Sequence, residues 1–218
     1  MYKVDLHTHS QASPDGGITA EQYAHVLSTG LLDMIAITDH NSIAYAQEVQ
    51  KQLGDKIIVG EEIMTNDGEI VGLFLTQVIE PGLSAQETCR RIKAQHGLVY
   101  IPHPFETVRK GLHPEKLEEI QKLVDIIEVC NGRALLQNRG SQAVVWSKLN
   151  RVPGAASSDA HGIHGLGKTY SRCTEFPTKA SLVKLIQGST LMTDRPNVRA
   201  LLYPKYHRLR KKLGAKRG

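Results

Sequence analysis

The segment Asp5-Leu6-His7-Thr8-His9-Ser10 follows a short strand-like run, Tyr2 to Leu6, and decides how the rest of the chain is interpreted. His7 and His9 are two residues apart, so on an extended strand both imidazoles leave the same face. Imidazole is a ligand for zinc, manganese and iron, and two imidazoles on one face can hold one ion together. The segment therefore predicts a metal site at the end of the first strand.

Beyond this segment, strand-like and helix-like stretches alternate along the sequence. A capping box, Thr19 to Gln22, opens the first helix, and Gly30 ends it. Further strands are expected at 34–38, 57–60, 70–75, 99–101, 126–129, 154–156 and 191–193, and further helices at 42–53, 84–95, 115–123, 137–149 and 179–187. This alternation predicts parallel strands with crossover helices, in a doubly wound sheet or a closed barrel. No G-x-G-x-x-G follows the first strand, which disfavours a dinucleotide-binding fold.

Side chains that can bind metals follow most of the predicted strands. They are Asp5, His7, His9, His40, Glu62, His103, Glu128, Asn131, Asp159 and His161. In a parallel barrel the carboxyl ends of all strands meet at one face, so we expect these side chains to converge. They are too many for one four-coordinate ion, which predicts two or three divalent ions of Mn, Zn or Fe. Such a cluster suits phosphate ester hydrolysis by metal-activated hydroxide.

Two arginines lie close in sequence to these candidates. Arg109 follows His103, and Arg133 follows Glu128. A guanidinium can donate two parallel hydrogen bonds to a phosphate group. We therefore expect Arg109 and Arg133 to bind the substrate phosphate.

Four segments make the sequence similar to the PHP family, the polymerase and histidinol phosphatase phosphoesterases. They are Asp5-Leu6-His7-Thr8-His9-Ser10, Ile37-Thr38-Asp39-His40, Pro102-His103-Pro104 and Ser158-Asp159-Ala160-His161, in the order found in the family. The resemblance implies a distorted (β/α)7 TIM-like barrel, a site with two or three metal ions, and phosphomonoesterase or nuclease activity. The short stand-alone members of the family look closest.

The resemblance also implies the roles of individual residues. The residues that match metal ligands of the family are His7, His9, Asp15, His40, Glu62, His103, Asp159 and His161. Glu61 competes with Glu62 for the place of the glutamate that bridges metals. Glu69 and Asn131 stand where many members carry histidine, and Glu128 matches a family glutamate. All three are further candidate ligands. The candidate catalytic residues are His7, His9, His40, His103, Asp159 and His161, one of which protonates the leaving oxygen.

Charge and composition indicate the domain organisation and the cellular compartment of the protein. The 218 residues carry a net charge of +5, and residues 205–218 hold seven cations and no acid, so the remainder is slightly acidic. We expect one barrel domain, 1–203, and a basic tail, 204–218, that is a solvated arm or touches nucleic acid. Three scattered cysteines, and the lack of a leader-like or membrane-spanning apolar run, predict a cytoplasmic protein.

Within the phosphoesterase prediction, the substrate is a small phosphomonoester, a nucleotide or the end of an oligonucleotide. Two alternatives stay open at this point. One is an amidohydrolase-like enzyme acting on C–N bonds, whose members also begin with H-x-H but usually use a carbamylated lysine within the barrel. The other is a non-catalytic barrel that binds nucleic acid through its basic tail.

Overall fold

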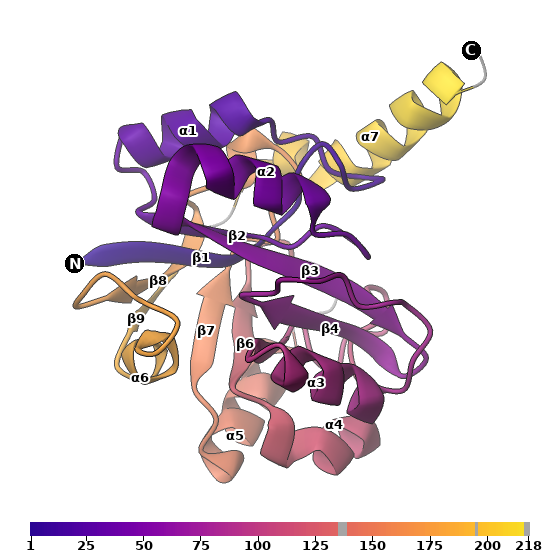
Figure 1. The fold of residues 1–218 in the computed structure, drawn as a ribbon, viewed down its shortest axis with the longest axis vertical. Helices are drawn as coiled ribbons and strands as arrows, with labels where there is room; N and C mark the ends of the chain where they lie inside the picture. Colours follow the sequence, from indigo (N-terminus) through magenta and orange to yellow (C-terminus); the bar gives the residue numbers. More distant parts are fainter. Residues whose placement is uncertain (135–138, 195, 216–218) are drawn as a thin grey trace.

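The computed structural model describes residues 1–134, 139–194 and 196–215, in which nine strands and seven α-helices form a nearly closed barrel (Figure 1). The strands are β1 Tyr2–Thr8, β2 Met34–Ile37, β3 Ile57–Thr65, β4 Gly68–Leu73, β5 Leu98–Ile101, β6 Ile126–Asn131, β7 Gly154–Ser157, β8 Thr169–Cys173 and β9 Thr190–Thr193. The helices are α1 Ala20–Ser28, α2 Ala44–Leu53, α3 Ala85–Ala94, α4 Pro114–Ile120, α5 Gly140–Asn150, α6 Leu182–Gln187 and α7 Val198–Ala215.

The strands lie in the order β7-β6-β5-β4-β3-β2-β1-β8-β9. The sheet curls so that its first and seventh strands also meet, because Thr8 forms an isolated parallel bridge with Ala160 and the His9 amide donates to the Ala160 carbonyl at 2.8 Å. The predicted TIM-like α/β barrel is therefore confirmed.

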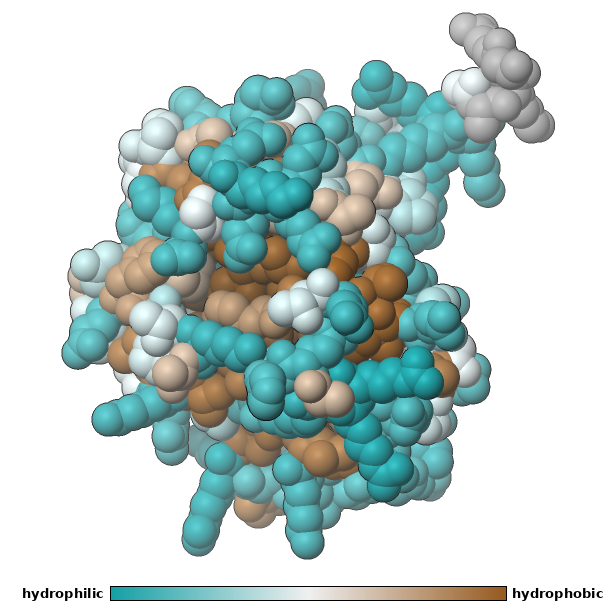
Figure 2. All heavy atoms as spheres, viewed as in Figure 1, coloured by the Kyte–Doolittle hydropathy of each residue, from teal (hydrophilic) through white to brown (hydrophobic). Residues whose placement is uncertain are grey.

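The barrel wall separates two hydrophobic clusters. Alternate strand residues such as Val4, Met34 and Ile58 pack together inside the barrel. Their neighbours pack outward against the helices, as Ile35 does with residues of α1 and α2. On the face drawn in Figure 2, hydrophobic residues show in a band across the middle, whereas the projecting part of α7 presents mostly hydrophilic residues. The period of two along each strand thus determines which side chains enter the barrel.

The expectation that all strands run parallel is wrong for β4 and β8. The strand β4 pairs antiparallel with both β3 and β5, because only Asn66 and Asp67 join it to β3. Parallel neighbours need a crossover of a dozen or more residues, so a two-residue connection forces a hairpin. Gly68, with φ +130°, accommodates the turn. The hairpin also extends β3 five residues beyond the predicted Gly60.

The strand β8 was missing from the predicted elements. It pairs antiparallel with β1 through Tyr2, Lys3 and Val4, and with β9 on its other side. Its residues alternate between buried and half-buried, but five residues are too few to give a distinct period-two signal. The preceding residues 166–168 form a turn.

The basic C-terminal residues form a helix where a solvated arm was one expectation. Helix α7 crosses the predicted boundary between residues 203 and 204, and the division at that boundary stays a prediction. His207 packs against Gly17, where a Cβ would lie 2.2 Å from the imidazole, so only glycine leaves room for it. Lys216 and Arg217 lie outside the described residues, as do positions 137 and 138 of the predicted fifth helix. In the part of the chain that is described, no helix combines the length and apolarity needed to cross a bilayer.

Candidate metal centre

A β-bulge in β1 turns both histidines of the H-x-H segment into the barrel. Four residues of β1, Asp5 to Thr8, lie opposite three residues of β2, Ile35 to Ile37. One extra residue reverses which side chains face inward. Val4 therefore joins the inner cluster and Thr8 faces outward, where its Oγ1 lies 3.1 Å from the Tyr23 hydroxyl. His7 and His9 face each other inside, with 3.1 Å between their Nε2 atoms.

Hydrogen bonds on the far side of each ring fix these two imidazoles. His7 Nδ1 lies 3.3 Å from a carboxylate oxygen of Glu128, which can only accept when ionised. His9 Nδ1 lies 3.2 Å from Ser13 Oγ, and Ser13 donates its own proton to Asp39 at 2.8 Å. Both Nδ1 atoms therefore carry hydrogen, and both Nε2 atoms turn toward the cluster. This is the orientation that an imidazole metal ligand needs.

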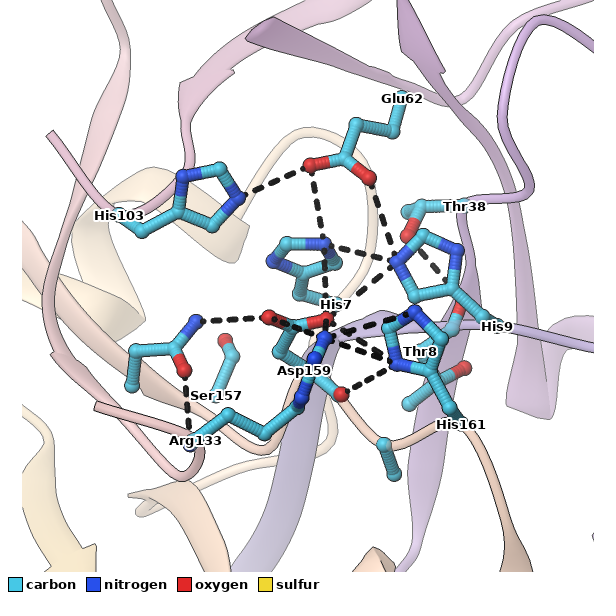
Figure 3. Close-up of polar contacts among 12 residues, drawn as sticks. His7, Thr8, His9, Thr38, Glu62, His103, Arg133, Ser157, Asp159 and His161 are labelled. Atoms are coloured by element: carbon cyan, nitrogen blue, oxygen red, sulfur yellow. Dashed lines mark hydrogen bonds and ion pairs between the residues drawn. The ribbon is translucent and has the colours of Figure 1, made fainter. Parts of the chain in front are cut away.

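Glu62 contacts four histidines of the cluster, and Figure 3 shows its carboxylate turned toward His7, His9 and His103. Its carboxylate oxygens lie 3.3 Å from His7 Nε2 and 3.3 Å from His9 Nε2. They lie 3.1 Å from His40 Nδ1 and 3.1 Å from His103 Nε2. The neighbouring Glu61 faces away from the cluster, where its Oε2 accepts the amide of Ile79 at 2.9 Å. The alternation of β3 therefore resolves the choice between the two glutamates, and Glu62 is the one that enters the cluster.

Two aspartates flank the histidines on opposite sides. Asp159 Oδ1 lies 3.4 Å from His9 Nε2 and 3.4 Å from His161 Nδ1. Asp15 Oδ1 lies 3.5 Å from His40 Nε2 and 3.5 Å from His161 Nε2. Asp159 and His103 both adopt positive φ, at 50° and 27°. Such strained backbone in non-glycine residues is concentrated at functional sites.

The three further candidate ligands occupy two kinds of position: Glu69 lies within the cluster, and the other two residues lie next to it. Glu69 lies in the cluster, 3.7 Å from His103 Nε2 and grouped with His40 and Glu62. Glu128 and Asn131 both reach inward because a second bulge interrupts β6 between them. The oxygens of Glu128 accept hydrogen bonds from His7, Tyr100 and the His103 amide, so it holds the histidines in place. The Asn131 side chain donates to Glu128 at 2.8 Å.

Burial and charge give the cluster a strongly perturbed set of pKa values. Burial lowers the pKa of His9, but the hydrogen bonds to Asp159 and Glu62 outweigh it and raise that pKa to about 9. Burial, together with Arg133 and His9, lowers the pKa of His161 to about 3. Burial raises the pKa of Glu69 to about 9, and the carboxylates of Glu62 and Asp159 add to it. Side chains of one type, such as His9 and His161, therefore have very different pKa values, as is common in catalytic sites.

The two arginines that we expected to bind phosphate both contact Asp159. Arg109 Nη1 donates to Asp159 at 2.8 Å and to Asn131 at 2.6 Å, and its other nitrogens donate to Glu106. Arg133 Nη1 lies 3.3 Å from Asp159. Burial opposes the charged form of Asp159, but Arg133 and His7 outweigh it and hold the pKa of this carboxyl well below its usual value. Both arginines line a pocket of about 470 Å³ with the metal-binding candidates.

The donor atoms fit divalent metal ions. Four groups of three side chains bring one ligand atom each within 4.8 Å of one another: His9, His40 and His161; His7, Glu62 and His103; His7, His9 and Asp159; and His40, Glu62 and Glu69. Asp15 Oδ1 and His103 Nδ1 are buried and have no hydrogen-bond partner among the described residues. Buried carboxylates and imidazoles whose donor atoms face each other are typical of carboxylate-rich metal sites.

A family model described as the PHP domain matches residues 5–208. The chain belongs to the PHP family. Its match spans every candidate metal ligand and most of α7. Two uncharacterized proteins of Methanocaldococcus jannaschii resemble it in sequence. One is 37% identical over half of this chain and 72% of its own length, and the other is 32% identical over 79% of this chain and 71% of its own length.

Solved structures share the fold of this PHP chain. A two-domain Bacteroides vulgatus protein containing a predicted PHP-like metal-dependent phosphoesterase superposes with a TM-score of 0.69 and 18% identity, over 95% of this chain and 69% of that one. A lesion-specific endonuclease of Pyrococcus furiosus gives 0.62 and 19%, over 88% of this chain and 57% of that one. An amidohydrolase from Chromobacterium violaceum gives 0.60 and 15%, over 92% and 96%. At these identities the likeness shows the shared fold.

Two parts of the PHP site were not predicted from the sequence. Ser13 links Asp39 to His9, because its Oγ donates to Asp39 and lies 3.2 Å from His9 Nδ1. The C-terminal helix supplies Arg208, whose Nη2 lies 2.5 Å from Asp15 Oδ2. Lys211 of the same helix donates to the backbone carbonyls of Gln11, Ser13 and Gly16. The only sequence signal was the density of cations in residues 205–218.

Proposed function

We propose that this PHP-family chain is a metal-dependent phosphoesterase that hydrolyses phosphate esters. The observation that carries the proposal is the position of Glu62, whose two oxygens lie within 3.3 Å of four imidazole nitrogens from three different segments. One carboxylate among four histidines suits a bridging ligand between ions. The four overlapping donor groups support two or three ions, of Mn, Zn or Fe.

The side chains that would hold the ions are those of His7, His9, Asp15, His40, Glu62, Glu69, His103, Asp159 and His161. Glu128 and Asn131 would lie in the layer behind these ligands. Bound divalent ions lower the pKa of a coordinated water and neutralise phosphate oxygens. The chain's own residues orient the imidazole ligands. Glu128 and Ser13 keep His7 and His9 in one tautomer, so that neither ring has to reorient when an ion binds.

Cations from two directions would position the phosphate. Arg109 and Arg133 approach the pocket from the Asp159 side, and Arg208 approaches from the Asp15 side. When a water oxygen bonds to phosphorus and the ester oxygen leaves, that oxygen takes a proton from a histidine or carboxyl group of the pocket. The pocket volume of about 470 Å³ suits a small phosphomonoester, a nucleotide or an oligonucleotide end.

The proposal is tested by metal content and turnover in one preparation. Protein purified without chelators is analysed for bound metals, then assayed with added manganese on p-nitrophenyl phosphate, bis-p-nitrophenyl phosphate and a short 5′-phosphorylated RNA. We expect two or three ions per chain and cleavage of an ester bond, detected as p-nitrophenol, inorganic phosphate or shortened RNA. Folded, metal-loaded protein that cleaves none of the three substrates would overturn the proposal.

Adjacent residues of β3 supply a matched control. Glu62→Gln replaces the carboxylate inside the cluster, and Glu61→Gln makes the same replacement on the opposite face of the same strand. We expect Glu62→Gln to lose bound metal and turnover, while Glu61→Gln keeps both. Equal losses in the two variants would mean that a general disturbance of β3, and not metal binding by Glu62, explains the result.

The two alternative functions give different outcomes in the same assay. An amidohydrolase would cleave amide or cyclic-urea substrates and leave the phosphate esters intact. Among the described residues of the pocket, the only lysine is the exposed Lys110, so a buried lysine for carbamylation is missing there. A non-catalytic barrel would bind RNA without turnover, with an affinity that depends steeply on salt.

A further inference from the structure

Helix α7 presents two different faces along its length. One face docks on the barrel: Ala200, Pro204 and His207 are buried, and Lys211 binds the carbonyls of residues 11–16. The opposite face carries Leu202, Tyr206, Leu209 and Leu213, with exposed fractions of 54%, 58%, 60% and 55%. Within the described residues, none of these four belongs to a hydrophobic cluster. The helix projects from the body, so this face is open to a partner (Figure 1).

The spacing of the exposed residues is that of a coiled-coil seam. Successive intervals of four, three and four residues place all four side chains in one narrow stripe, equivalent to alternating d and a positions of a heptad repeat. A stripe confined to these positions matches a single partner helix, whereas a helix lying in a lipid surface needs a broader apolar face. The seam spans 12 residues, or roughly 18 Å of helix.

Cations line both edges of this seam. Lys205 and Lys212 occupy the g positions on one edge, and Arg210 occupies the e position on the other edge. In coiled coils these flanking positions choose the partner by charge. A second copy of the chain would place Lys205 against Arg210 in a parallel pair, and like residues against each other in an antiparallel pair. Both arrangements repel, so the seam does not suit self-association.

We propose that the exposed seam of α7 is a docking surface for an acidic amphipathic helix of a partner protein. Leucines of that helix would cover Leu202, Tyr206, Leu209 and Leu213, and its glutamates or aspartates would pair with the flanking cations. Burial of the stripe supplies the affinity, and the charges supply the choice of partner. This surface lies on the opposite side of α7 from Arg208, so it does not depend on the proposed activity.

The test uses the full chain and two labelled synthetic peptides. Both peptides are three heptads long with leucine at a and d, and they carry either glutamate or lysine at e and g. We expect the glutamate peptide to bind by fluorescence anisotropy at least tenfold more tightly than the lysine peptide, and the difference to shrink as salt rises. Equal affinity for both peptides, or no binding of the glutamate peptide, would overturn the proposal.

Variants distinguish binding at the seam from nonspecific hydrophobic binding. Leu202→Ser with Leu209→Ser should weaken binding of the glutamate peptide at least tenfold, while Leu149→Ser, which alters an exposed leucine of α5, should leave it unchanged. Lys205→Glu with Arg210→Glu keeps every leucine and should reverse the preference toward the lysine peptide. This charge reversal keeps the test decisive if the serine variant loses helix by circular dichroism. An unchanged preference after charge reversal contradicts the proposal.

Three other occupants give distinct results, and each would replace the acidic helix. A dimer in sedimentation equilibrium that the serine pair abolishes would identify a second copy. Binding to vesicles of phosphatidylserine and phosphatidylcholine, without binding of the glutamate peptide, would identify a membrane surface. Binding of a DNA duplex that is lost on charge reversal but kept in the serine pair would identify nucleic acid.

Discussion

The two aspartates that flank the histidine cluster receive their cations in different ways. On the Asp159 side, Arg109 and Arg133 come from the loops after β5 and β6, and their side chains are 15% and 21% exposed. On the Asp15 side, Arg208 comes from α7 and is 61% exposed. Removing one partner from a buried network of charges costs far more stability than removing one partner of an exposed ion pair. The barrel itself therefore builds the Asp159 side, and a docked helix completes the Asp15 side.

The largest expected effect follows from replacing Asp159. Asp159→Asn removes the charge that faces His7, His9 and His161, and it leaves two arginines without their shared acceptor. We expect kcat to fall by about 1000-fold, or about 4 kcal/mol, with loss of bound metal. Asp15→Asn is the matched change on the other side and should cost less. A greater loss in Asp15→Asn, measured by kcat and metal content, would reverse the comparison.

Removal of Arg109 is expected to lower stability as well as activity. Arg109 pairs with the buried Glu106 and with Asp159, so Arg109→Ala leaves Glu106 without its guanidinium and Asp159 with Arg133 alone. We expect about 3 kcal/mol of destabilisation, a drop in Tm of roughly 6–12 °C. Thermal unfolding of the metal-free protein measures this directly. A shift within error would show that solvent or neighbouring groups compensate both carboxylates.

Glu61 is a buried carboxylate, and no cation pairs with it among the described residues. Burial raises its pKa to about 7, against the opposing hydrogen bond from the Ile79 amide. The folded state therefore favours the protonated acid, and the resulting stability is complete below about pH 4.5 and lost as pH rises through 7. Glu61→Gln should remove that loss and stabilise the protein by roughly 2–3 kcal/mol at pH 8 but not at pH 4. Denaturant unfolding at both pH values checks the sign. Equal effects at the two pH values would contradict it.

The smallest expected effect belongs to Arg208. Because its side chain is mostly exposed, Arg208→Ala should change the free energy of unfolding by less than about 0.5 kcal/mol. If Arg208 positions substrate phosphate, KM should rise by about tenfold with little change in kcat. Arg208→Lys should restore part of the affinity, since it returns the charge without the planar fork. A fall in kcat with unchanged KM would place Arg208 elsewhere in the mechanism.

Residues 5 to 161 contained enough information to predict the barrel and to name the side chains that converge in it. Strand ends share one face of a barrel, so His7, His40, His103 and His161 could be brought together without coordinates. The antiparallel β4 also had a signal, since Asp67-Gly68 is a hairpin sequence, but the expected alternation obscured it.

Other features depend on which strands pair and in which register. The bulges of β1 and β6 are defined only by counting residues on two strands together, so no single segment reveals them. The contact between Arg208 and Asp15 joins residues 193 apart, and one cation among several gave no reason to choose it. The separation of Glu61 from Glu62 likewise needed the direction in which β3 faces the barrel.

The join between β1 and β7 also determines when the cluster of histidines and carboxylates can form during folding. The Ser158 amide donates to Asp5 across 153 residues of sequence, next to the bridge between Thr8 and Ala160. Contacts between such distant residues form slowly, because the chain must lose loop entropy before they stabilise it. His7 and His9 are therefore synthesised long before Asp159 and His161 can join them. A fragment that ends before β7 would contain most of the donors without the enclosed cluster, and ions offered to it would meet separate ligands on an open sheet.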